Sequence, residues 1–167
     1  IQSISKIITL GLALETFGPD GVFDKVGVEP SGEAFDSLVE LDSKNNPYNP
    51  MVNSGAITIA SRLLDEYDQE YMLEYTRKLC SDPEIVYDED VYQSEMATCS
   101  RNRAIAYLLQ SKKIIENDVE GSLAFYTRMC SMSVTARSLA NLGRLLANGG
   151  RDYATGEQVI SPQTTRI

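Results

Sequence analysis

Segments with helical periodicity, bounded by Gly, Pro and Asn, fill most of the sequence and predict a mainly helical chain. The first segment begins near Ser3 and ends near Phe17, where Pro19 and Gly21 interrupt the pattern. Further helices are expected at about 53–67, 69–80, 91–112, 117–130 and 135–148. Near the end of the chain, residues 158–160 are expected to form a short strand, and a serine then caps the opening of another helix.

The start of the first helix carries a possible nucleophile and base. The run IQSISK places Ser3 three residues before Lys6, in a chain that contains no histidine. Residues at i and i+3 of a helix share a face, so Lys6 can reach the hydroxyl of Ser3. A Ser-His-Asp triad cannot form without histidine, and a lysine can replace it as base only if its pKa is lowered. The pair indicates a serine activated by lysine, although the spacing alone also fits a capping serine beside a solvated lysine.

Ser5 is a second hydroxyl close to the lysine in sequence. Adjacent residues of a helix point in different directions, so Ser5 is expected to face away from Lys6. If Ser3 lies in the first turn, the positive end of the helix dipole also favours an alkoxide or oxyanion there. Ser3 is therefore the preferred nucleophile.

Several ordered blocks of the sequence resemble the serine-dependent glutaminases. The matching blocks are QSISK, VGVEPSGEAFDSLVEL, YNPMVNSGAI, VYQSEMATCSRNRAIAYLL and AFYTRMCSMSVTARSLANLGRLLANGG. Together they cover almost the whole chain. Members of this family share the fold of class A β-lactamases and penicillin-binding proteins, and they hydrolyse L-glutamine to L-glutamate and ammonia. The resemblance implies an α+β fold of the serine β-lactamase/DD-peptidase type, of which this chain forms mainly the helical part, with the sheet largely outside it.

The same resemblance implies the residues of an active site. Ser3 attacks the side-chain amide carbon of glutamine while Lys6 takes its proton, ammonia leaves, and water then hydrolyses the acyl-enzyme ester. Substrate binding is carried over to Ser3, Asn53, Glu95, Asn102 and Tyr126. No cofactor and no metal are implied.

The four other binding residues also have simpler explanations. Glu95 and Asn102 are seven residues, or two helical turns, apart, and therefore project from one face of the expected 91–112 helix. They could form a clamp for the substrate, with Glu95 as partner of its α-ammonium, or a solvated stripe. Asn53 could equally be an N-cap, and Tyr126 a half-buried core aromatic.

Composition narrows the choice of partners. The net charge of −9 disfavours nucleic acid, because phosphate binding needs clusters of basic residues. Cys80, Cys99 and Cys130 lack C-x-x-C spacing, which indicates reduced thiols in a cytoplasmic protein rather than zinc ligands or disulfides. No apolar run approaches the roughly 18 residues of a membrane span. We expect a cytoplasmic protein that binds L-glutamine, and the family resemblance implies a homodimer or homotetramer.

Residues 1–167 are expected to be a single glutaminase domain truncated at both ends, because the chain starts two residues before Ser3 and stops as a helix opens. Two other functions stay open. A β-lactamase or penicillin-binding-like hydrolase shares the Ser-x-x-Lys spacing but normally shows S-D-N and K-T-G elements, and neither is in this sequence. The other is a non-catalytic module that binds glutamine for regulation.

Overall fold

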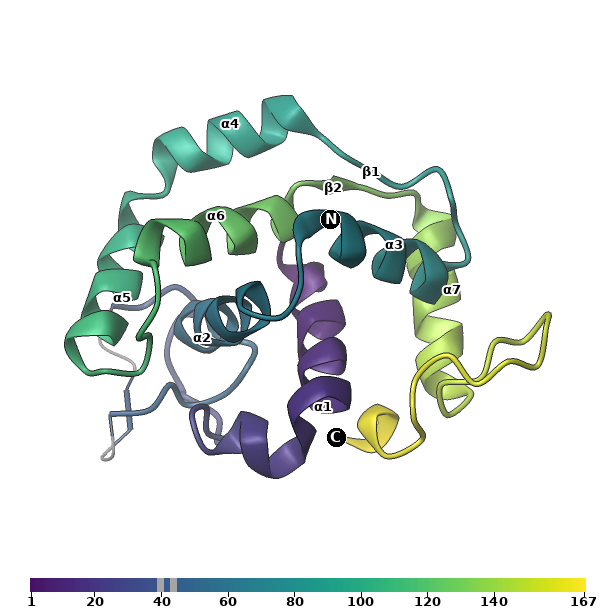
Figure 1. Ribbon diagram of the computed structural model, residues 1–167, viewed down its shortest axis with the longest axis horizontal. Helices are drawn as coiled ribbons and strands as arrows, with labels where there is room; N and C mark the ends of the chain where they lie inside the picture. The colour runs from purple at the N-terminus through teal and green to yellow at the C-terminus, as the bar shows by residue number, and fades with distance from the viewer. Residues whose placement is uncertain (39–40, 43–44) are drawn as a thin grey trace.

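The computed structural model describes residues 1–38, 41–42 and 45–167, and helices dominate this part of the chain (Figure 1). The α-helices are α1 (Ser5–Phe23), α2 (Asn53–Leu64), α3 (Gln69–Cys80), α4 (Glu89–Thr98), α5 (Ser100–Ser111), α6 (Val119–Cys130) and α7 (Ala136–Ala147). Two 3₁₀ helices, η1 (Gln2–Ile4) and η2 (Thr164–Arg166), lie near the two ends. Strands β1 (Val86–Tyr87) and β2 (Met132–Ser133) pair antiparallel.

Helix α1 runs through the middle of the molecule, with α2 on one side and α3 and α7 on the other (Figure 1). Helix α2 packs against α1, α5 and α6, and α3 packs against α7. The core between these helices contains the fully buried side chains of Ile8, Ile57, Ile105 and Phe125. Burial of such apolar side chains is the main stabilising contribution to the fold.

Side-chain caps stand at the starts of α3, α6 and α7, among other helices. The Asp68 carboxylate accepts a hydrogen bond from the Tyr71 amide at the start of α3, and Asp118 caps α6 in the same way. Thr135 and Ser138 form a reciprocal capping box at the start of α7. These bonds satisfy backbone N–H groups that the first turn of a helix leaves without an intrahelical partner.

The first predicted helix is longer than expected. The helical trace of α1 continues to Phe23, but Gly18 interrupts it with φ 69° and ψ 168°. Pro19 can start the second helical segment because the first residue of a helix needs no N–H donor. The prediction of an end near Phe17 is correct for the first segment only.

The predicted 91–112 helix is wrong as a single element. Cys99, with φ −79° and ψ 22°, separates α4 from α5, so Glu95 and Asn102 lie on different helices. The predicted strand at 158–160 is an isolated bridge between Arg151 and Gln158. Residues 53–67 are helical only as far as Leu64. Among the described residues, no helix is long and apolar enough to span a lipid bilayer.

Candidate active site

All five predicted substrate-binding residues line one pocket of about 140 Å³. They come from five different elements, namely η1, α2, α4, α5 and α6. The complete lining is Gln2, Ser3, Phe35, Asn53, Glu95, Cys99, Asn102, Tyr126, Thr127 and Cys130. Residues far apart in the sequence thus converge on one small, mostly polar site of the kind that binds a small molecule.

Lys6 lies beside this pocket, in the first turn of α1. Its side chain is buried, with 3% of the residue exposed. The Lys6 ammonium nitrogen donates hydrogen bonds to the Met51 carbonyl at 2.8 Å and to Asn53 Oδ1 at 2.6 Å, and it lies 5.5 Å from the centre of the Phe35 ring. Burial lowers the pKa of Lys6 below its ordinary value, because the charged form loses hydration. The structure therefore provides the condition under which a lysine can act as a base.

Asn53 connects the lysine to the pocket. Its Oδ1 accepts the hydrogen bond from Lys6 and a second, longer one from the Tyr126 hydroxyl at 3.4 Å. Its Nδ2 donates to Asn102 Oδ1 at 2.9 Å. Val52, not Asn53, is the N-cap of α2, so the simpler explanation of Asn53 as a capping residue is wrong.

The turn before α2 fixes the carbonyl that holds the lysine. Asn49 Oδ1 accepts hydrogen bonds from the N–H groups of Met51 at 2.9 Å and Val52 at 3.2 Å. Helix α2 then passes so close to this turn that a Cβ on Gly55 would lie 2.1 Å from the Asn49 carbonyl oxygen. Only glycine permits this approach. The NPMVNSG run is therefore needed to present the Met51 carbonyl to Lys6.

Ser3 and Ser5 have different surroundings. Ser3 is exposed, lines the pocket and lies near the Tyr126 hydroxyl, with which its side chain interacts. Ser5 is 2% exposed and does not line the pocket. Its hydroxyl forms a hydrogen bond with the Cys130 thiol at 3.7 Å. A substrate can reach Ser3 but not Ser5, which favours Ser3 as the nucleophile.

Glu95 and Tyr126 also line the pocket. The Glu95 carboxylate accepts a hydrogen bond from the Gln2 amide at 3.3 Å. The expected shared helical face of Glu95 and Asn102 does not exist, and the two residues meet because the chain bends at Cys99. Tyr126 is 6% exposed, and burial raises the pKa of its phenol, so the side chain stays protonated and can donate a hydrogen bond at neutral pH.

Several lining residues were not predicted from the sequence. Cys99 and Cys130, expected to be reduced thiols, are buried and free, and both also line the pocket. Cys130 follows Tyr126 by four residues on α6, so the two side chains are neighbours on the helix surface. This spacing is the sequence signal that could have placed Cys130 at the pocket. Phe35 comes from an irregular segment, and its backbone carbonyl accepts a hydrogen bond from the backbone N–H of Asn53 at 2.8 Å.

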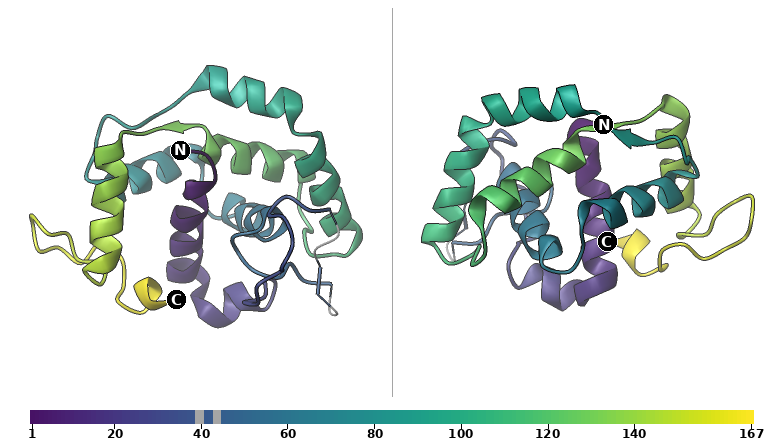
Figure 2. Two further views of the ribbon diagram at one scale, coloured as in Figure 1. Left: turned by 180° about the vertical axis from the view of Figure 1, so that it is seen from behind. Right: turned by 45° about the horizontal axis from the view of Figure 1, so that its top comes forward.

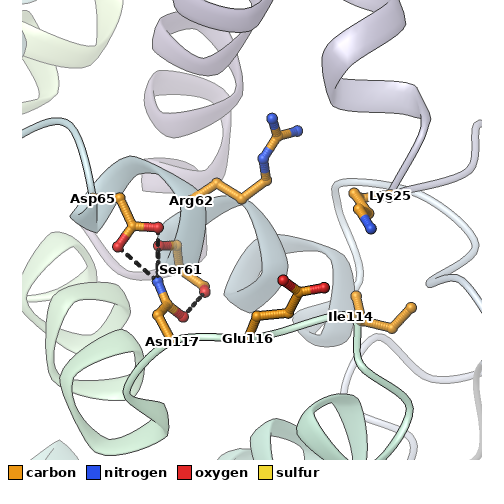
Figure 3. Close-up of a pocket in the computed structure, with 7 residues that line it drawn as sticks. All are labelled: Lys25, Ser61, Arg62, Asp65, Ile114, Glu116 and Asn117. Atoms are coloured by element: carbon orange, nitrogen blue, oxygen red, sulfur yellow. Dashed lines mark hydrogen bonds between the residues drawn. The ribbon is translucent and has the colours of Figure 1, made fainter.

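A second pocket of about 350 Å³ lies near the other end of α2 (Figure 3). There the Asn117 side-chain amide donates hydrogen bonds to the Ser61 carbonyl at 2.7 Å and to the Asp65 carboxylate at 3.0 Å. Lys25, Arg62 and Glu116 complete its charged lining (the full lining is shown in Figure 3). None of these residues was predicted to take part in chemistry, and the Asn117 bonds tie the α5–α6 loop to α2. Within the described ranges, no group of three or more His, Cys, Asp or Glu could hold a metal ion.

Comparisons with known proteins show the family of this chain. The sequence model of the Glutaminase family matches residues 1–167. "Glutaminase 2" of Clostridium perfringens is 46% identical over 172 residues, which cover 100% of this chain and 56% of that protein. "Glutaminase" of Alkaliphilus metalliredigens is 42% identical with the same coverage. This chain thus spans about half the length of the curated relatives it matches.

Solved structures show the same likeness. A probable glutaminase of Bacillus subtilis superposes with a TM-score of 0.92 at 36% identity, over 99% of this chain and 55% of that one. A structure described as the Bacillus subtilis probable glutaminase complexed with 6-diazo-5-oxo-L-norleucine has a TM-score of 0.84 at 34% identity, over 99% and 51% of the two chains. The likeness confirms the predicted fold class, to which this chain contributes mainly helices. The chain belongs to the glutaminase family.

Proposed function

We propose that the protein hydrolyses L-glutamine to L-glutamate and ammonia. The observation that carries this proposal is the buried Lys6, held by Asn53 beside a pocket that Ser3 also lines. The relatives named glutaminases support the substrate. The ligand of the Bacillus subtilis structure supports it too, because 6-diazo-5-oxo-L-norleucine has the α-amino acid group of glutamine and a carbonyl carbon where glutamine has its amide carbon.

The pocket suits the two ends of glutamine. The Glu95 carboxylate is the charged acceptor for the α-ammonium, and the Asn102 and Tyr126 side chains offer donors for the α-carboxylate. With the α-amino acid group held there, the side-chain amide extends toward Ser3. A substrate oriented in this way meets the nucleophile without a search for the correct geometry.

The reaction follows from the protonation state of the lysine. Neutral Lys6 takes the proton of the Ser3 hydroxyl as Ser3 Oγ attacks the amide carbon, giving a tetrahedral oxyanion. Lys6 returns that proton to the amide nitrogen, the C–N bond breaks, and ammonia leaves. Water then attacks the γ-glutamyl ester of Ser3, releasing L-glutamate and restoring the serine hydroxyl.

The cellular setting is part of the same proposal. A cytoplasmic location fits the three cysteines, which are all free in the structure. A homodimer or homotetramer follows from the family resemblance alone. Light scattering of the purified protein measures its molar mass directly, and a monomer at micromolar concentration would contradict this part.

The function is tested by assaying glutamate and ammonia release from L-glutamine, with nitrocefin as an alternative substrate. Glutamine turnover without nitrocefin hydrolysis is expected. Nitrocefin hydrolysis without glutamine turnover would replace the proposal with a β-lactamase-like activity. Calorimetric binding of glutamine with no release of ammonia would instead indicate a non-catalytic binding module.

A further inference from the structure

Helix α4 carries the acidic side of the pocket, yet it is weakly attached to the molecule. None of its residues is buried, although Glu95 on this helix lines the pocket. Both views in Figure 2 show α4 at the outer edge of the molecule. A helix without buried apolar side chains gains little stability from packing, so specific contacts must decide where it lies.

One arginine on the neighbouring helix α6 supplies the main side-chain contacts that hold α4 in place. The Arg128 guanidinium, on α6, stacks over the Tyr92 ring, with its central carbon 3.5 Å from the ring centre. The same guanidinium forms an ion pair with the Glu89 carboxylate in the first turn of α4. It also lies 5.6 Å from the centre of the Tyr87 ring in β1. The Arg128 side chain is 16% exposed, so water screens these contacts only in part.

The contact lies on the face of α4 that bears the site residue. Tyr92 and Glu95 are three residues apart and therefore neighbours on the helix surface. On α6, Tyr126 and Thr127 line the pocket immediately before Arg128. Arg128 thus joins two helices that both contribute side chains to the pocket.

Other contacts hold the two ends of α4. At its start, the Asp88 amide donates to the Ser131 carbonyl at 2.9 Å, and the Asp88 side chain caps the helix at the Val91 amide. At its end, Cys99 joins it to α5. In the described residues, the pocket side of α4 has one further side-chain hydrogen bond, from Gln2 to Glu95, and it is solvent-exposed.

We propose that Arg128 is a positioning residue that sets the place of Glu95, and through it the affinity for the α-ammonium of the substrate. The inference rests on the proposed function for the identity of that substrate. The planar guanidinium matters as well as its charge, because only arginine can stack on Tyr92 and pair with Glu89 at once. Arg128 itself is outside the pocket lining and takes no part in the chemical steps.

The experiment compares Arg128→Met and Arg128→Lys with the wild-type protein. Arg144→Met is the matched control, because Arg144 on α7 also stacks on a tyrosine, Tyr153, at 4.9 Å but lies on another helix. Circular dichroism and thermal melting establish that each variant is folded. Amide hydrogen exchange of residues 89–98 then reports the attachment of α4 without reference to any activity.

For Arg128→Met we expect faster exchange across 89–98 and a KM for glutamine raised by roughly tenfold to a hundredfold, with kcat changed by less than about threefold. Arg128→Lys should fall between Arg128→Met and wild type, and Arg144→Met should match wild type. Glutaramate, which lacks the α-ammonium, should show no comparable rise in KM. Combining Arg128→Met with Glu95→Gln should add little to the effect of Glu95→Gln alone.

Wild-type exchange and wild-type KM in Arg128→Met would overturn the inference, as would an equal rise in KM for glutaramate. If the wild-type protein binds glutamine without turnover, the proposed function is overturned but the role of Arg128 is not. The affinity for glutamine, measured by calorimetry, then replaces KM in the comparison of the variants. A wild-type protein that does not bind glutamine would overturn both.

Discussion

Lys6 Nζ lies 2.6 Å from Asn53 Oδ1, and Asn53 Nδ2 lies 2.9 Å from Asn102 Oδ1. One side-chain amide therefore contacts both the candidate base and the substrate pocket. Its oxygen is a neutral acceptor, which orients the ammonium nitrogen while favouring its charged form less than a carboxylate would. The arrangement allows burial to keep the pKa of Lys6 low.

The pH dependence of the wild-type protein follows from that lowered pKa. In the proposed mechanism neutral Lys6 is the active form, so we expect activity above its pKa and a loss of activity as the pH falls below it. We expect kcat/KM for glutamine to rise with pH along a limb centred below the ordinary lysine value of 10.5. Lys6→Ala should lose the limb and about 10³-fold or more of the activity. A limb at the ordinary lysine pKa would contradict the role of burial.

Asn53→Asp places a carboxylate next to the lysine and should raise its pKa. Because an adjacent opposite charge shifts a pKa by roughly 1–3 units, kcat/KM near neutral pH should fall by about tenfold or more, and the acid limb should move to higher pH. Asn148→Asp, at the end of α7, is the control with the same change of charge far from the site. An unmoved limb in Asn53→Asp would show that Lys6 does not titrate in the reaction.

Glu95→Gln should weaken glutamine binding by several kcal/mol, about 2–5, if the pair with the substrate ammonium is desolvated. Asn102→Ala should cost less, about 1–3 kcal/mol, because it removes a neutral hydrogen-bonding partner. Calorimetry in a Ser3→Ala background measures both affinities without turnover. An unchanged affinity in Glu95→Gln would remove Glu95 from substrate recognition.

Gly55→Ala should destabilise the protein and disturb the site together. The added methyl group would meet the Asn49 carbonyl oxygen at 2.1 Å, which forces the backbone of α2 or of the preceding turn to move. Strain of this kind costs about 1–3 kcal/mol or more of unfolding free energy. In Gly143→Ala nothing lies within 4 Å of the new carbon, and the helix should gain about 0.5–1 kcal/mol. Denaturant unfolding compares the two variants, and equal stabilities would contradict the account of this turn.

Much of the fold could be predicted from local signals in the sequence. The starts of the expected helices at 53–67, 69–80 and 135–148 depend on near neighbours in the chain, and the structure confirms them to within one residue. The break at Cys99 could not be predicted, because neither glycine nor proline marks it. Strands of two residues, such as β1, are too short to show an alternating pattern.

For the candidate site, the identities of the residues could be predicted but their mutual contacts could not. Ser3, Lys6 and the four binding residues could be named from the family resemblance, and five of these six line the pocket, with Lys6 directly behind Asn53. Their mutual contacts could not be predicted, since the Lys6–Asn53 and Asn53–Asn102 bonds join residues 47 and 49 positions apart. Only tertiary packing brings such residues together.

The most direct measurement of the central claim identifies the residue that becomes acylated. The protein is mixed with L-glutamine, quenched with acid within the first turnovers, digested, and its peptides are analysed by mass spectrometry. We predict a γ-glutamyl ester on Ser3, its absence in Ser3→Ala together with a loss of about 10³-fold or more in turnover, and an ester with near wild-type turnover in Ser5→Ala. An ester on any other residue, or wild-type turnover in Ser3→Ala, would contradict the assignment of Ser3 as the nucleophile.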